Sequence, residues 1–193
     1  MLMLEASHPS GVVGIGKQAL HTARATLLSD LGQRGAERLQ EIGSAAGEEM
    51  YGAFQQWLPG FAGVDGPDAL DAEALGDVLA AFFSKLGWGD VQVDRLGESG
   101  LALISTNWAE AVSTEARDFP SCHFTAGLLA DFLTRMAGGR PLAIMEVECR
   151  TRGDARCRFV AGAPVTLDAV YQAVSEGRDF TEVFANASGA SAS

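Results

Sequence analysis

Apolar residues recur at helical spacing over residues 17–58. Within this stretch they follow the i, i+3, i+4 and i+7 positions, which is typical of helices that bury one face. Gly32 and Gly35 interrupt the pattern, so the sequence predicts two helices with a break between them. Gly43 and Gly47 lie one helical turn apart in the second helix. They predict close packing against another helix, with a ligand as the alternative neighbour.

A segment rich in proline and glycine, residues 59–67, predicts a loop after the second helix. Either Asp68 or Asp71 can then cap a third helix, which ends where two glycines follow. Alternating apolar residues on both sides of a turn at 97–100 predict a hairpin of two strands. A short helix is predicted over residues 108–116.

The C-terminal half combines one long core helix with a second hairpin. The helix follows Cys122, carries its apolar residues on one stripe and ends at a pair of glycines. Residues 141–149 and 157–160 predict two strands joined by a turn at 152–155, and a further helix is predicted over 166–175. Helices followed by hairpins, without regular alternation of strand and helix, predict an α+β fold with an antiparallel sheet.

The charge balance argues against two classes of partner. The chain carries 14 basic and 25 acidic residues, a net charge of -11. This charge repels the phosphates of nucleic acids and anionic bilayers, so neither is an expected partner. No apolar run approaches the roughly 20 residues that span a bilayer, so no membrane insertion is expected. The start of the chain lacks the basic region of a secretory signal, and we expect a cytoplasmic protein.

One domain is the expected organisation. The 193 residues, 47% of them hydrophobic, suffice for one substantial core. The predicted boundaries are an N-terminal extension over 1–16, a single ligand-binding domain over 17–185, and a disordered tail of small and polar residues over 186–193.

The three cysteines are the strongest chemical signal in the sequence. Cys149 and Cys157 lie symmetrically about Gly153, so an antiparallel hairpin that turns there places their sulfurs opposite each other. Cys122, at the start of a helix, can supply a third thiolate, and a carboxylate can complete the tetrahedron that zinc prefers. The alternative is that the cysteines are small buried apolar residues.

Strand geometry does not choose the carboxylate. Period-two alternation puts both Glu146 and Glu148 on the face opposite Cys149, so either one needs a bulge or a strong twist to reach the sulfurs. Arginines in and beside the turn, among them Arg150 and Arg158, can offset the negative charge of such a site. An ordinary solvated basic turn is the alternative.

Two segments carry a resemblance to a known family. The motif Cys-His-Phe-Thr-Ala-Gly at 122–127, followed by residues 140–159 with the pattern Glu, two residues, Cys, seven residues, Cys, resembles the 4-vinyl reductase domain family. The resemblance implies that Cys122, Glu146, Cys149 and Cys157 bind zinc, as in related phenol-sensing activators. It also implies a helical layer on a twisted antiparallel sheet, as in TRAPP transport-complex subunits, and a dimer.

Aromatic residues suggest where a small molecule could bind. Small-molecule sites are mostly apolar with few polar groups. The predicted pocket residues are Phe82, Phe83, Asn107, Trp108 and Phe124. His123 is expected beside the metal ligands rather than as a catalytic base. Core packing is the alternative for each aromatic residue.

A binding module is the favoured function. We expect a zinc-stapled domain that encloses or senses a small hydrophobic ligand and passes the signal to a downstream protein. The alternatives are an enzyme component that reduces a vinyl group in bacteriochlorophyll synthesis, and a transport-complex scaffold. Four protein ligands leave zinc no open position, which disfavours metal catalysis. Residues 11–18 only approximate a phosphate-binding loop, because Gln18 replaces the needed hydroxyl and no strand precedes it.

Overall fold

Two helices joined at a glycine form the outer layer of the molecule. The computed structural model describes residues 12–112 and 117–187, in which α1 spans Lys17–Leu31 and α2 spans Gln33–Ala62. Gly32 has φ 57 at the junction, a left-handed conformation that glycine adopts readily, so the predicted break is confirmed. The loop predicted from Pro59 begins later, because α2 continues to Ala62. Phe61 stacks on Trp57 at 4.3 Å between ring centroids and supports this last turn.

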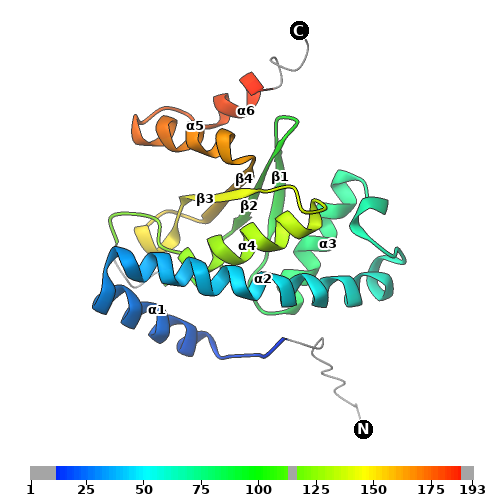
Figure 1. Ribbon diagram of the computed structural model, residues 1–193, viewed down its shortest axis with the longest axis horizontal. Coiled ribbons are helices and arrows are strands. Elements are labelled where there is room, and N and C mark those ends of the chain that lie inside the picture. The colour runs from blue at the N-terminus through cyan, green and yellow to red at the C-terminus, as the bar shows by residue number, and fades with distance from the viewer. Residues whose placement is uncertain (1–11, 113–116, 188–193) are drawn as a thin grey trace.

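The glycines of α2 allow a second helix to approach closely. This second helix is α4, His123–Met136, which lies between α2 and the sheet (Figure 1). A Cβ at Gly43 would lie 2.0 Å from the carbonyl oxygen of Phe124, and one at Gly127 would lie 2.0 Å from that of Gln40. Both helices therefore need glycine at the crossing. The helix-packing interpretation of this glycine pattern is confirmed.

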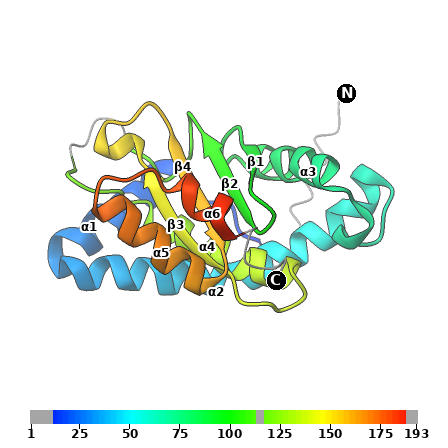
Figure 2. The ribbon, with the colours of Figure 1, turned by 90° about the horizontal axis from the view of Figure 1, so that it is seen from above.

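The four strands form one antiparallel sheet in the order β1-β2-β4-β3 (Figure 2). Both predicted hairpins are present. The strands are β1 (Gln92–Leu96), β2 (Gly100–Ser105), β3 (Ala143–Glu148) and β4 (Cys157–Gly162). Between β3 and β4 the turn contains a short 3₁₀ helix, η2, Arg150–Arg152.

The helix α3, Ala72–Lys85, packs near the edge strand β1. A short 3₁₀ helix, η1, Pro67–Ala69, precedes it. The carboxylate of Asp71 accepts hydrogen bonds from the backbone N–H groups of Glu73 (3.1 Å) and Ala74 (2.9 Å). Asp71 is therefore the cap, which decides between the two aspartates left open by the sequence.

The predicted helix over 108–116 is wrong for the part that the structure describes. Residues 108–112 form an irregular turn, and residues 113–116 lie outside the described ranges. Backbone groups in this turn make tertiary bonds in place of helical ones: the N–H of Ala109 donates to Trp88 O (2.8 Å), and that of Val112 donates to Thr151 Oγ1 (3.0 Å).

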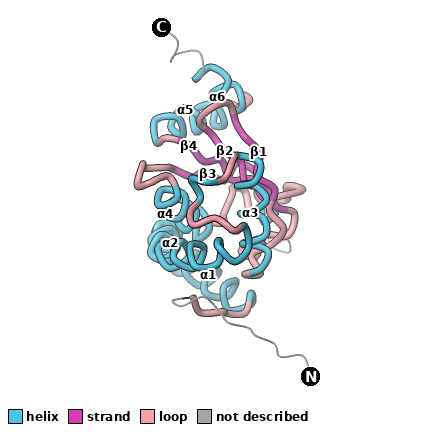
Figure 3. Tube along the Cα trace, turned by 90° about the vertical axis from the view of Figure 1, so that its right-hand side faces the viewer, coloured by secondary structure: helices cyan, strands magenta, loops and turns pink. Residues whose placement is uncertain are grey.

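Helices cover both faces of the sheet (Figure 3). One core cluster lies between the sheet and α2, α3 and α4, and a second lies between the opposite face and the C-terminal helices. The C-terminal helices are α5, Pro164–Ser175, and α6, Thr181–Ala187. The sequence did not predict α6, which runs into the first two positions of the expected tail.

Residues 1–11 and 188–193 lie outside the described ranges. Among the described residues, no helix is both long and apolar enough to cross a bilayer.

Candidate functional site

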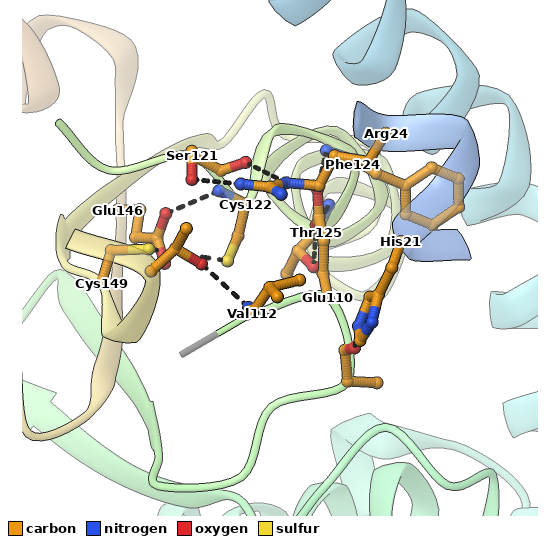
Figure 4. A network of polar contacts seen from close by, with 12 residues as sticks. His21, Arg24, Glu110, Val112, Ser121, Cys122, Phe124, Thr125, Glu146 and Cys149 are labelled. Carbon is orange, nitrogen blue, oxygen red and sulfur yellow. Dashed lines mark hydrogen bonds and ion pairs between the residues drawn. The ribbon is translucent and has the colours of Figure 1, made fainter. Parts of the chain in front are cut away.

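Four side chains that could hold a metal ion meet in the interior between α4 and the β3–β4 hairpin. They are Cys122, Glu146, Cys149 and Cys157, whose ligand atoms all lie within 4.8 Å of one another. Cys122 occupies the N-cap position of α4, Glu146 lies in β3, Cys149 directly follows β3, and Cys157 begins β4. All four are buried, and Figure 4 shows three of them converging.

A β-bulge determines which glutamate joins the cysteines. Glu148 pairs with Arg158 across the hairpin, whereas Glu146 pairs with Phe159, so the register shifts by one residue at Val147. The extra residue therefore places Glu146 and Cys149 on the same face and turns Glu148 to the other one. Glu148 instead binds Arg156 at 2.6 Å and Arg158 at 3.4 Å.

The distance between the sulfurs of Cys122 and Cys149 fits a tetrahedral zinc ion. Tetrahedral Zn–S bonds of about 2.3 Å place two sulfurs roughly 3.8 Å apart, and the sulfurs of Cys122 and Cys149 are 3.9 Å apart. A disulfide would need about 2.0 Å. One oxygen of Glu146 accepts the backbone N–H of Cys122 at 2.8 Å, and its other oxygen, Oε1, is buried without a hydrogen-bond partner among the described residues. That oxygen is a free ligand atom.

The electrostatics of the cluster also favour a cation. Burial, together with the charge of Cys149, raises the pKa of Glu146 to about 8. Hydrogen bonding to Cys149 and Cys157, and burial, raise the pKa of Cys122. Hydrogen bonds with Cys122 and Cys157 instead lower the pKa of Cys149. Without a positive ion, the charge on Cys149 therefore opposes ionisation of the other three groups. A divalent cation reverses this effect.

The basic residues of the hairpin mainly bind other carboxylates. Arg152 pairs with Asp154 at 2.7 Å and donates to the carbonyl of Val147 at the bulge (3.0 Å). Arg158 pairs with Glu148 and lies over the ring of Phe180. Arg150 begins η2, half-buried.

His123 follows Cys122 directly at the start of α4. It is half-buried, its Nε2 has no hydrogen-bond partner among the described residues, and burial lowers its pKa.

A second buried polar network, which the sequence patterns did not predict, holds the start of α4 (Figure 4). The carboxylate of Glu110 accepts from Phe124 N (3.1 Å), Thr125 N (2.7 Å) and Thr125 Oγ1 (2.6 Å). Arg24 of α1 lies 4.0 Å from Glu110 and donates to the carbonyl of Ser121 (3.1 Å). Arg24 and Glu110 are both 0% exposed. The available signal was Arg24 itself, a charged residue one helical turn after Leu20 on the buried face.

The charge state of Glu110 depends on its burial. Removal from water raises its pKa to about 7, although the hydrogen bonds from Thr125 and Phe124 and the nearby Arg24 oppose the shift. This carboxyl group therefore titrates near neutral pH.

A cavity of about 390 Å³ opens beside the start of α4. It lies between the segment 12–17, α2, the end of α3 and α4. Most of its lining is apolar, and three charged residues also line it. The lining residues are Val12, Val13, Gly14, Ile15, Lys17, Leu20, Ala46, Glu49, Met50, Lys85, Leu86, Gly87, Trp88, Ala109, Phe124 and Leu128. Trp88 and Phe124 stack with their ring planes 10° apart.

Among the five predicted pocket residues, Phe124 lines this cavity. Phe82 and Phe83 are buried in the core. Trp108 is also buried, and its Nε1–H donates to Thr125 Oγ1 at 2.7 Å. The side-chain amide of Asn107 binds Asp90, accepting its N–H at 2.8 Å and donating to its carboxylate at 2.9 Å. Sequence patterns do not separate core aromatics from cavity aromatics, because both are apolar.

The fold and the buried ligand set define an α+β domain with an antiparallel sheet, a closed cysteine–glutamate cluster and an apolar cavity. Residues 108–163, which contain all four cluster residues, match the family model of the 4-vinyl reductase domain. The predicted resemblance to the 4-vinyl reductase family is therefore confirmed over this segment. No curated protein matches the chain by sequence.

Solved structures share the fold at low sequence identity. The phenol-responsive sensory domain of the transcription activator PoxR, solved with phenol, has a TM-score of 0.61 and 14% identity over 90% of this chain and 83% of that one. A trafficking protein particle complex subunit 3 from Naegleria fowleri, covalently bound to palmitic acid, has a TM-score of 0.59 and 13% identity, with 76% and 91% covered. A vinyl-4-reductase family protein from Methanocaldococcus jannaschii has a TM-score of 0.49 and 18% identity, with 78% and 83% covered. The α+β fold is as predicted.

Proposed function

We propose that this chain is a binding or sensing module that holds a small hydrophobic molecule in the cavity. The cavity carries the proposal, because its lining is mainly apolar and its volume of about 390 Å³ falls within the range of small-molecule sites, roughly 300–1,000 Å³. Of two proteins with similar fold, one was solved with phenol and the other covalently bound to palmitic acid, and both molecules have a large apolar part.

The cysteine–glutamate cluster supports a structural zinc ion as the resident metal. Cys122, Cys149, Cys157 and Glu146 would supply four protein ligands, which leaves no open position for water or substrate. Bound zinc would supply a cross-link between the start of α4 and the β3–β4 hairpin. Because such a site forms only in the folded chain, zinc binding would stabilise the fold. Thiolate ligands require reduced cysteines, which supports a reducing compartment such as the cytoplasm.

We further propose one domain over residues 17–185 that works as a homodimer and passes ligand occupancy to a protein partner. Residues 12–16 belong to the expected extension, yet four of them line the cavity. This segment is therefore well placed to respond when the cavity fills.

Native mass spectrometry of freshly purified protein tests the metal, the oligomer and any retained ligand together. We expect one zinc per chain and a dimer. A retained tetrapyrrole with reductant-dependent turnover would favour the reductase alternative. A stable protein partner with no small molecule would favour the scaffold.

Binding of decanol, a neutral apolar probe, tests the cavity directly. Ala46 is a half-buried residue of α2 that lines the cavity, so Ala46→Phe should fill the space and abolish decanol binding measured by calorimetry. Its neighbour Ala45 is exposed, and Ala45→Phe is the matched control that should bind normally. If decanol does not bind the unmodified protein, or binds Ala46→Phe equally well, the cavity is not the ligand site.

A further inference from the structure

The only two lysines of the chain line the same cavity. Lys17 opens α1 and Lys85 ends α3, so they are 68 positions apart in the sequence, 85 minus 17. Both side chains are exposed, which places their ammonium groups at the mouth rather than in the apolar interior. Among residues 12–112 and 117–187, neither forms an ion pair. Two flexible cations therefore stand at the mouth of an apolar space, and no described residue forms an ion pair with either of them.

The charge of the cavity lining is opposite in sign to the net charge of the whole chain. The chain has a net charge of -11, whereas the charged residues of the cavity lining are Lys17, Lys85 and Glu49, a net charge of +1. In addition, α1 begins at this mouth without a side-chain cap and without an acidic residue in its first turn. Its first N–H groups add a partial positive charge in the same place.

We propose that the ligand is an amphiphile with an apolar body and a carboxylate head group. This inference rests on the proposed function and adds the chemistry of the head group. The body would lie against Trp88 and Phe124, which stack on each other in the lining. The carboxylate would stay at the mouth between Lys17 and Lys85, where it keeps part of its hydration and avoids the large cost of a buried charge.

Three probes with one hydrocarbon chain separate the head group from the body. Decanoate, decanol and decylamine present a negative, a neutral and a positive head. Their affinities can be measured by calorimetry, and Trp88 in the lining offers an independent fluorescence signal. We expect decanoate to bind most tightly and decylamine most weakly, and only the decanoate affinity should fall steeply as salt is added.

Substitution of each lysine then tests whether the two ammonium groups cause the preference for decanoate. Lys17→Met and Lys85→Met keep the chain length and remove the charge. Each should weaken decanoate binding by roughly two- to five-fold, the range of an exposed ion pair, and the double variant by about tenfold. Decanol binding should not change. Glu49→Gln should strengthen decanoate binding. Arg178→Met, beyond α5 on the opposite face of the sheet, is the control that should alter neither affinity.

The possible results separate the head-group inference from the proposed binding function on which it rests. If decanol binds as tightly as decanoate and the lysine variants change nothing, the cavity holds a neutral apolar ligand and the head-group inference is wrong. If none of the three probes binds, the proposed function fails as well. If decanoate binds preferentially but the lysine variants retain that preference, another part of the protein recognises the acid, and the assignment to these lysines is wrong.

Discussion

A single inserted residue selects the carboxylate of the cysteine–glutamate cluster. Without the bulge at Val147, strand alternation would leave Glu146 on the face away from Cys149. With it, Glu146 is buried and presents one unpartnered oxygen to the sulfurs. An unsatisfied buried acceptor costs about 1–3 kcal/mol, and more when it is charged. A bound cation would remove this penalty. The position of Glu146 and the negative charge of the cluster therefore both favour a cation.

The two neighbouring glutamates form a matched pair for testing this argument. Glu146→Gln removes the anionic ligand and should weaken zinc binding by at least about 10–100-fold, since even outer partners of metal ligands contribute that much. Glu148→Gln disturbs only its pairs with Arg156 and Arg158 and should leave zinc affinity within about two-fold. Competition with a chromophoric chelator measures both. Equal losses in the two variants would contradict the ligand assignment.

Glu110 should make stability depend on pH near neutrality. Its pKa rises from 4.5 to about 7 on burial, so between these values the folded state binds more protons than the unfolded state. Stability from this group is complete below about pH 4.5 and is lost as the pH rises through about 7. The loss is on the order of 3 kcal/mol for a shift of this size.

Urea unfolding of the zinc-loaded protein at several pH values checks this dependence. Glu110→Gln cannot titrate, so its stability should change less between pH 5 and pH 8 than that of the unmodified protein. Glu98→Gln, in the exposed turn between β1 and β2, is the control and should retain the full slope. A Glu110→Gln variant with an unchanged slope would show that another group titrates.

At the scale of elements, the start of α4 joins the cysteine–glutamate cluster to the cavity. The N–H of Cys122 donates to Glu146, and the N–H groups of Phe124 and Thr125 donate to Glu110. Two buried carboxylates therefore satisfy N–H groups that a helix start leaves without partners. Negative charge is also favoured at this end of the helix dipole. The same turn that carries Cys122 of the cluster thus carries Phe124 of the cavity wall.

The α2–α4 contact should be sensitive to a single methyl group. Gly43→Ala would place a Cβ 2.0 Å from the Phe124 carbonyl, and because that neighbour is backbone, the helices must separate. We expect a destabilisation of about 1–3 kcal/mol or more. Gly52→Ala, in the same helix with nothing within 4 Å, should stabilise by about 0.5–1 kcal/mol. Urea unfolding compares the two, and equal effects would exclude the packing argument.

The sequence predicted elements wherever apolar spacing repeats over several turns or strands. It found the glycine break before α2, both hairpins and the helix after Cys122, because local period and turn residues determine them. It missed α6, which is only seven residues long. It also missed the irregular turn at 108–112, whose backbone bonds reach Trp88 and Thr151, far away in sequence.

The candidate site also combines features that local sequence patterns predict with features that they do not. Hairpin symmetry about Gly153 indicated two of the four cluster residues. The bulge that selects Glu146 has no local signal, and the family pattern supplied that choice. The cavity combines residues 12–15 with residues of four helices, α1, α2, α3 and α4. Its lining depends on how these helices pack, which hydrophobic spacing does not specify.

At the scale of the whole molecule, the cluster and the cavity share one short path. Cys122 and Phe124 are two residues apart at the start of α4, and Ala109 in the cavity lining precedes Glu110, which holds Phe124. His21 of α1 donates to the carbonyl of Ala109 at 2.8 Å, so α1 is tied to the same point. Zinc that fixes this turn would also fix the cavity wall, which reduces the ordering that a ligand must impose.

Zinc and ligand should therefore strengthen each other. We expect saturating decanol to raise zinc affinity, measured at equilibrium against a competing chelator, by several-fold. Linkage requires zinc to raise decanol affinity by the same factor. The Ala46→Phe variant, whose cavity is filled, should show unchanged zinc affinity with and without decanol. If decanol binds the unmodified protein but leaves its zinc affinity unaltered, the two sites are energetically independent, and zinc stabilises the hairpin without a part in ligand recognition.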